Sequence, residues 1–199
     1  MSYIGGILPD ININSVNHKS EEEIFNFSNN NIKTLLFWYP KDFTFVCPSE
    51  IIAFSKRVAD FKERGVNVIG VSVDSQFSHF AWRETPVNQG GIGRVNMPLV
   101  ADLTKDISRA YDVLLDGGVA LRGSFLIDAD GTIRHAVIND LPLGRNIDEM
   151  IRMVDTMLFT NEFGEVCPAG WVKGDDGMTA STEGVAEYLA SHEEIGRAS

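Results

Sequence analysis

The stretch Phe37-Trp-Tyr-Pro-Lys-Asp-Phe-Thr-Phe-Val-Cys-Pro-Ser-Glu50 places a cysteine where an apolar run ends and a helical pattern begins. Residues 32–39 are mostly apolar and end at a proline, which predicts a short strand buried on both faces of a sheet. Over residues 48–64 apolar side chains recur mainly at three- and four-residue steps, and Gly65 then ends the pattern as a helix terminator does. Cys47 is therefore expected at the junction of a strand and a helix.

A thiol at this junction is suited to chemistry. The first amides of a helix have no intrahelical acceptors and lie at the positive end of its dipole, so they stabilise a sulfur there as an anion. A thioredoxin-type enzyme would carry its second thiol three residues further on, where this chain has Glu50. The only other cysteine is Cys167, in the segment 164–171. It is the one candidate partner of Cys47, within one subunit or from a second subunit.

The flanking segments predict an α/β protein. Residues 66–73 are expected to form a second buried strand, which completes a βαβ unit with parallel pairing. The β-rich runs 123–128 and 132–138 flank Ala129-Asp-Gly131, a typical hairpin signal. Apolar residues at helical steps over 147–158 predict a helix that covers the sheet. This order predicts a thioredoxin-like fold, with a central mixed β-sheet flanked by helices.

Two segments are less regular. Ser20-Glu-Glu-Glu23 resembles a helix capping box, whereas residues 23–27 alternate as an edge strand does, so both alternatives stay open. Beyond residue 159 the composition turns to Gly, Asp, Glu, Ser and Thr, which predicts a mobile tail with a short helix around 185–189. We therefore expect a thioredoxin-like domain over residues 1–160 and a C-terminal extension over residues 161–199.

Composition limits the class of protein. A chain of 199 residues with 44% hydrophobic residues is long enough for a full core. Its formal net charge of -11 disfavours nucleic acid and anionic membranes, because both would repel it. Residues 1–10 lack a positively charged leader followed by a long apolar run, and no stretch reaches membrane-spanning length. We expect a cytoplasmic protein with no nucleic-acid or membrane partner, in which two thiols are inert or catalytic.

Several motifs resemble one family. Pro40, Thr44 and Cys47 fit a Pro-x-x-x-Thr-x-x-Cys signature, and Cys167 lies in Val-Cys-Pro. With these residues the chain resembles the typical 2-Cys peroxiredoxins, from residue 37 to residue 171. Further matching segments follow in order, at 51–54, 71–74, 90–93 and 139–145. The resemblance implies a thiol peroxidase that reduces hydrogen peroxide and organic hydroperoxides to water and alcohols, with no cofactor and no metal.

The resemblance also implies catalytic roles. Cys47 is the peroxidatic residue that becomes a sulfenic acid, and Cys167 of the partner subunit is the resolving residue that converts it to a disulfide. Arg122 is expected to stabilise the thiolate and the leaving oxygen with its planar, permanently charged guanidinium. Thr44 is expected to hydrogen-bond the peroxide. Pro40, which has no amide proton, is expected to screen the sulfur from water.

Three more residues are expected around this site. Glu50 and Arg145 are similar to partners that orient the arginine, and Trp82 is similar to an aromatic residue that packs near the pocket. A simpler interpretation makes the Glu50–Arg145 pair a surface ion pair without function, and Cys47 alone a buried, unreactive thiol. Other polar residues are interpreted as ordinary polar positions: Asp74, His79 and His135. Two cysteines without histidines at ligand spacing argue against a zinc site.

Partners follow from the same resemblance. It implies a homodimer linked head to tail by Cys47 and Cys167 when oxidised, and a decamer built from such dimers. Phe77 matches the segment that joins dimers, although a Phe-x-x-Phe helix face also fits a core. Segment 139–145 and the acidic tail favour thioredoxin as the reductant, with a flavoprotein disulfide reductase as the alternative. Hypotheses from other classes are a redox-controlled holdase chaperone and a protein disulfide oxidoreductase, and Glu50 argues against the latter.

Overall fold

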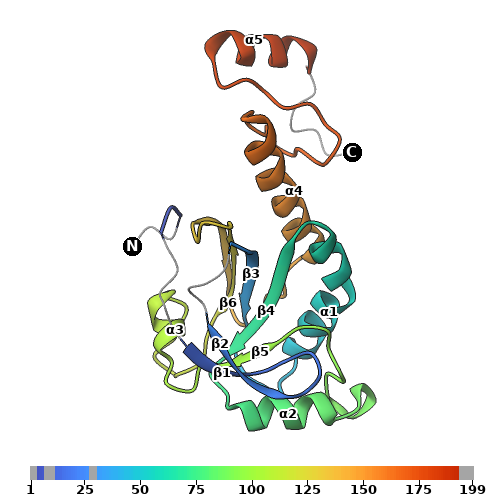
Figure 1. The fold of residues 1–199 in the computed structure, drawn as a ribbon, viewed down its shortest axis with the longest axis vertical. Helices are drawn as coiled ribbons and strands as arrows, with labels where there is room; N and C mark the ends of the chain where they lie inside the picture. Colours follow the sequence, from blue (N-terminus) through green and yellow to red (C-terminus); the bar gives the residue numbers. More distant parts are fainter. Residues whose placement is uncertain (1–3, 7–11, 27–30, 193–199) are drawn as a thin grey trace. The chain divides into compact units, whose positions relative to one another are not determined.

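The computed structural model describes residues 4–6, 12–26 and 31–192, which form two compact units divided between residues 147 and 148. The first unit is built around one seven-stranded sheet (Figure 1). Its strands are β1 (Asn12–Val16), β2 (Glu22–Asn26), β3 (Lys33–Trp38), β4 (Val66–Ser72), β5 (Leu99–Ala101), β6 (Arg122–Ile127) and β7 (Ile133–Asn139). The helices of the chain are α1 (Cys47–Glu63), α2 (Gln76–Glu84), the short η1 (Val87–Gln89), α3 (Asp106–Ala110), α4 (Ile147–Phe163) and α5 (Thr182–Ser191).

The sheet is mixed, as predicted. Its strand order is β2-β1-β5-β4-β3-β6-β7, in which β3, β4 and β5 run parallel and the other neighbours pair antiparallel. The βαβ unit β3-α1-β4 and the hairpin β6-β7 confirm two predictions. Leu36 of β3 pairs with Ile69 of β4 on one side and with Phe125 of β6 on the other. All three are buried, as a strand in the middle of a covered sheet requires.

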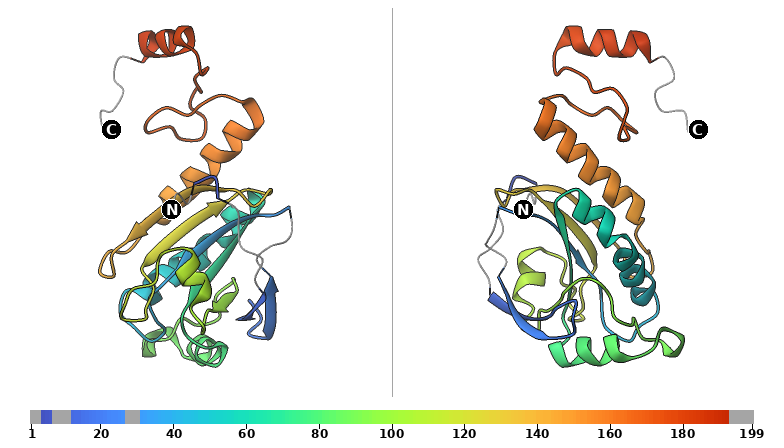
Figure 2. Two further views of the ribbon diagram at one scale, coloured as in Figure 1. Left: turned by 90° about the vertical axis from the view of Figure 1, so that its left-hand side faces the viewer. Right: turned by 45° about the vertical axis from the view of Figure 1, so that its right-hand side comes forward.

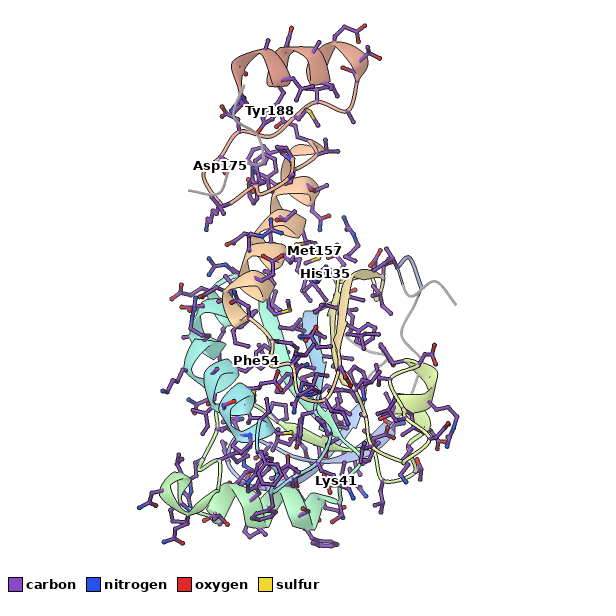
Figure 3. The ribbon with its side chains drawn as sticks, turned by 180° about the vertical axis from the view of Figure 1, so that it is seen from behind. Lys41, Phe54, His135, Met157, Asp175 and Tyr188 are labelled. Carbon is purple, nitrogen blue, oxygen red and sulfur yellow. The ribbon has the colours of Figure 1, made fainter. Side chains whose placement is uncertain are left out.

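Successive residues of β3 point to opposite faces of the sheet, and each face carries a helix. The ring of Phe37 stacks on that of Phe54 in α1, with centroids 4.1 Å apart; Phe54 is labelled in Figure 3. Trp38 packs on Tyr111, directly after α3, and its indole N–H donates to Ser108 Oγ at 3.1 Å. Helices α1 and α3 therefore cover opposite faces of the sheet (Figures 1 and 2).

Helix α1 begins at Cys47 itself. Val46 occupies the N-cap position without a side-chain cap, and Pro48 lies in the first turn, where its missing N–H costs no hydrogen bond. Gly65 follows the helix with φ of 69°, the left-handed conformation that ends many helices. The predicted helix is confirmed, and the Cys47 thiol belongs to its first residue.

The segment that was left open forms a strand. Strand β2 pairs antiparallel with β1, with Ile13 opposite Phe25. The turn between them is closed by the Asn17 side chain, whose oxygen accepts from the backbone N–H groups of Lys19 and Glu21 at 2.9 and 3.1 Å. The capping-box interpretation was wrong because the acidic residues of 21–23 lie on an exposed hairpin.

The second unit contains α4 and α5. Helix α4 confirms the predicted helix and continues five residues beyond it, to Phe163. The short helix predicted near the C-terminus is α5, where the Ser181 hydroxyl accepts from the Gly184 N–H at 3.0 Å. Between them Val166 and Met178 form an isolated antiparallel bridge. Within the described ranges, no helix has the length and apolar character needed to cross a membrane.

Candidate active site

Cys47 lies beside an arginine at the start of helix α1. Its side chain is fully buried, and its Sγ is 3.4 Å from Nη1 of Arg122. Arg122 is the first residue of β6, which pairs with β3, the strand that precedes the cysteine loop. The strand order thus brings together two residues that are 75 positions apart. A guanidinium next to a sulfur at the first residue of a helix is an arrangement that can stabilise a thiolate.

The Arg122 side chain is held on two sides. Its Nε donates to the carbonyl of Leu141 at 2.7 Å, and its Nη1 donates to Oε2 of Glu50 at 2.6 Å. The side chains of Arg122 and Glu50 are 4% and 3% exposed. Because both ends of the guanidinium have fixed acceptors, Arg122 is oriented toward the sulfur before any ligand binds.

Glu50 also pairs with Arg145, as the resemblance implied. Arg145 donates to Oε1 through Nε at 2.8 Å and through its backbone N–H at 2.9 Å, and to Oε2 through Nη2 at 3.1 Å. Arg145 is anchored in turn by donation to the Gly123 carbonyl at 2.6 Å. The pair is 1% and 3% exposed, so the interpretation as a surface ion pair was wrong.

The carboxyl of Glu50 is held in its ionised form. Burial by itself would raise the pKa of Glu50, but the hydrogen bonds and charge of Arg145, with the charge of Arg122, outweigh burial and lower it below its ordinary value. Burial has the opposite effect on Arg145 and lowers its pKa, because it disfavours the charged guanidinium. The hydrogen bond and the charge of Glu50 partly offset this lowering. The result is a buried cluster of two guanidiniums around one carboxylate next to the thiol.

The loop between β3 and α1 carries the two other predicted residues. Pro40 is buried and lies two residues after the end of β3. Thr44 is partly buried, and its hydroxyl donates to the Lys41 carbonyl at 2.7 Å, which closes a turn; Lys41 is labelled in Figure 3. The Thr44 oxygen keeps lone pairs that can accept a further hydrogen bond.

Trp82 packs against this loop from α2. It is fully buried, its ring centroid lies 5.7 Å from that of Phe43 and 6.0 Å from that of Tyr39, and its indole N–H donates to the Gly90 carbonyl at 2.9 Å. The structure therefore places Trp82 behind the loop that precedes Cys47, near the predicted site.

Comparison with known proteins identifies the family. The model of the AhpC/TSA family matches residues 4–136, two thirds of the chain. The chain belongs to the AhpC/TSA family. A second model, the C-terminal domain of 1-Cys peroxiredoxin, matches residues 157–191.

Relatives within the AhpC/TSA family are similar over nearly the whole chain. Alkyl hydroperoxide reductase C from Helicobacter pylori is 62% identical over 186 residues, which are 92% of this chain and 94% of the relative. The reduced 2-Cys peroxiredoxin of Plasmodium vivax has a TM-score of 0.93 and 43% identity, and covers 96% of this chain and 100% of its own. Thioredoxin peroxidase I of Plasmodium yoelii has a TM-score of 0.77 and 44% identity, and covers 86% and 99%. The protein is a thiol peroxidase with a thioredoxin-like fold, and its substrates are peroxides.

The second cysteine of this AhpC/TSA family member lies in the second unit. Cys167 is partly buried, with its Sγ 3.8 Å from both the Thr160 hydroxyl and the Thr156 carbonyl of α4. Both cysteines are free thiols in the structure. Over the described part of the chain, no cluster of three or more His, Cys, Asp or Glu side chains is arranged to hold a metal ion.

A polar network that no sequence motif indicated lies beside the loop that carries Thr44. His79 is fully buried and lies 2.8 Å from Asp42, a residue that was not singled out, while Asp74 accepts from the Asp42 backbone N–H at 2.9 Å. His79 and Asp74, which were interpreted as ordinary polar positions, are two of the residues that contact Asp42. No periodicity could have revealed the pair, because Asp42 lies 37 residues from His79 and in a loop.

Proposed function

We propose that Cys47 is the peroxidatic residue, and the contact between Arg122 and its sulfur carries this assignment. The thiolate attacks one oxygen of the peroxide, an S–O bond forms and the O–O bond breaks. The sulfur becomes a sulfenic acid, and the other oxygen leaves with a proton as water or an alcohol. The guanidinium contributes fixed positive charge both to the attacking sulfur and to the departing oxygen.

We propose for the surrounding residues the roles that the family resemblance implies. Thr44, at the end of the turn before α1, hydrogen-bonds the bound peroxide, and Pro40 excludes water without offering a donor. Glu50 and Arg145 hold Arg122 in place through the contacts described above. Trp82 supports the loop from behind. In-line attack requires such fixed positions, because the reacting atoms must be aligned.

We propose that Cys167 of a partner subunit resolves the sulfenic acid. Its sulfur displaces the sulfenic oxygen, a disulfide forms and water leaves. This step implies a homodimer, and we propose that such dimers assemble into a decamer. Phe77 and Phe80 of α2 are 67% and 44% exposed, which contradicts a core role for this pair and supports a contact surface.

Thioredoxin is the proposed reductant of the disulfide. The name of the Plasmodium yoelii relative, thioredoxin peroxidase I, supports it, as does the resemblance of segment 139–145. A dedicated flavoprotein disulfide reductase is the second candidate, and turnover measured with each reductant separates the two. Because the cycle needs a compartment that reduces disulfides, we place the enzyme in the cytoplasm.

One experiment tests the cysteine assignments. Reduced protein is treated with one equivalent of hydrogen peroxide, resolved on a non-reducing gel and mapped by mass for disulfide peptides, beside Cys47→Ser and Cys167→Ser. A dimer band with a Cys47–Cys167 link, absent from both variants, is expected. A linked monomer would show resolution within one subunit, and failure of Cys47 to oxidise would contradict its role.

A further inference from the structure

Asp42 and His79 form a buried hydrogen-bonded pair outside the cluster that touches the thiol. His79 Nδ1 is 2.8 Å from Asp42 Oδ2, and the two side chains are 0% and 1% exposed. The Tyr39 hydroxyl donates to the other Asp42 oxygen at 3.0 Å, and the Asp42 backbone N–H donates to Asp74 Oδ2 at 2.9 Å. Asp42 is thus held from three directions, by α2, by the end of β3 and by the segment after β4.

Both ring nitrogens of His79 face an oxygen atom. Its Nδ1 lies 2.8 Å from the Asp42 carboxylate, and its Nε2 lies 3.2 Å from the Val100 carbonyl of β5. The Tyr39 hydroxyl lies 3.4 Å from Nδ1 and donates to Asp42. Because the ring is buried, these contacts fix its orientation between the Asp42 carboxylate and β5.

Asp42 also anchors a turn with an unfavourable backbone. The next residue, Phe43, has φ of 53°, a left-handed conformation that residues other than glycine keep only when their surroundings hold them. Thr44 closes the same turn by its bond to the Lys41 carbonyl. Three residues later the chain reaches Cys47. The buried pair therefore holds the loop at the point that determines where Thr44 lies.

We propose that His79 and Asp42 are positioning residues of the peroxidase, whose buried hydrogen-bonded pair holds the turn 41–44 so that Thr44 meets the peroxide at Cys47. Neither residue touches the reacting atoms. This inference rests on the proposed role of Thr44. Loss of the pair misaligns the peroxide, while the helix amides and Arg122 still stabilise the thiolate.

Two reactions of Cys47, both measured in the full chain, distinguish a loss of peroxide positioning from a general disruption of the site. Hydrogen peroxide requires alignment of two oxygens, whereas iodoacetamide requires only the thiolate. In His79→Gln the peroxide rate is expected to fall about tenfold or more, while alkylation stays within about twofold. His18→Gln, an exposed histidine in the turn between β1 and β2, should change neither rate. An equal fall in both rates, or an unchanged peroxide rate, overturns the proposal.

Further variants test the same positioning role if His79→Gln folds poorly. Tyr39→Phe removes the hydroxyl that donates to Asp42 and should lower the peroxide rate selectively. Asp42→Asn combined with His79→Gln should lose no more rate than the worse single variant, because the two act as one unit. Additive losses overturn the proposal.

Thr44→Val separates the proposed role of Thr44 from the positioning role of His79 and Asp42. If Thr44→Val keeps the full peroxide rate, the proposed role of Thr44 is wrong and the positioning inference is overturned with it. If Thr44→Val lowers the peroxide rate and His79→Gln does not, the positioning inference alone is overturned. A selective loss of the peroxide rate in both variants supports both.

Discussion

Arg145 donates hydrogen bonds to both carboxylate oxygens of Glu50, a residue 95 positions earlier in the chain, through Nε at 2.8 Å and Nη2 at 3.1 Å. The same carboxylate accepts from Arg122, which reaches the Cys47 sulfur. The buried Glu50 carboxylate thus fixes the direction of Arg122 beside the Cys47 sulfur and balances part of the charge of two guanidiniums.

Glu50→Gln should destabilise the fold. The amide leaves two buried guanidiniums without a carboxylate, and breaking a buried ion pair costs about 3–5 kcal/mol in free energy of unfolding. Urea unfolding followed by circular dichroism measures this change. Glu84→Gln breaks the exposed Arg94–Glu84 pair and should cost less than about 1 kcal/mol. Equal effects of the two substitutions would contradict the structural role of Glu50.

The stabilising effect of Glu50 should depend on pH. Because the folded-state pKa of Glu50 lies below its unfolded value of about 4.3, its ionised form contributes stability above that pH. The contribution is lost as the pH falls through the folded-state pKa. The difference in free energy of unfolding between the native protein and Glu50→Gln should therefore shrink between about pH 7 and about pH 3. A difference that stays constant in urea unfolding over this range would refute the prediction.

Arg122→Lys should slow the reaction with peroxide although it keeps the charge. An ammonium cannot reach the Leu141 carbonyl, Glu50 and the sulfur with the geometry of a planar fork. We expect the rate of Cys47 oxidation, measured by stopped-flow fluorescence, to fall about 100-fold. Arg109→Lys, at an exposed arginine paired with Asp106, is the matched control. A lysine variant as fast as the control would show that charge alone suffices.

Two neighbouring glycines should respond differently to alanine. Gly90 has φ of 84° with open space around it, so Gly90→Ala should cost about 1–2 kcal/mol for the backbone conformation alone. A Cβ on Gly91 would overlap the backbone of Thr85 at the end of α2, so Gly91→Ala should cost at least about 3 kcal/mol. Thermal unfolding measures the loss of stability in both variants. A smaller loss in Gly91→Ala than in Gly90→Ala would contradict the close approach of Gly91 to Thr85.

Much of the fold could be predicted because the signals are local. The apolar run of β3, the helical steps of α1 and the Asp-Gly turn between β6 and β7 each lie within a few residues. Residues 22–26 show the limit of such signals, since the same acidic segment fits a helix start and an edge strand. These residues form a strand because they pair with β1.

The sequence by itself determined that a thiol begins a helix, because the strand, the proline and the helical pattern around Cys47 are consecutive. Only the tertiary structure decided what surrounds that thiol. The strand order places β6 beside β3 and brings Arg122 to the sulfur, and burial turns the Glu50–Arg145 pair into a fixed support. His79 meets Asp42 only through the packing of α2 on the sheet. Such contacts depend on which elements pack together, and this is set by burying the whole core rather than by any local pattern.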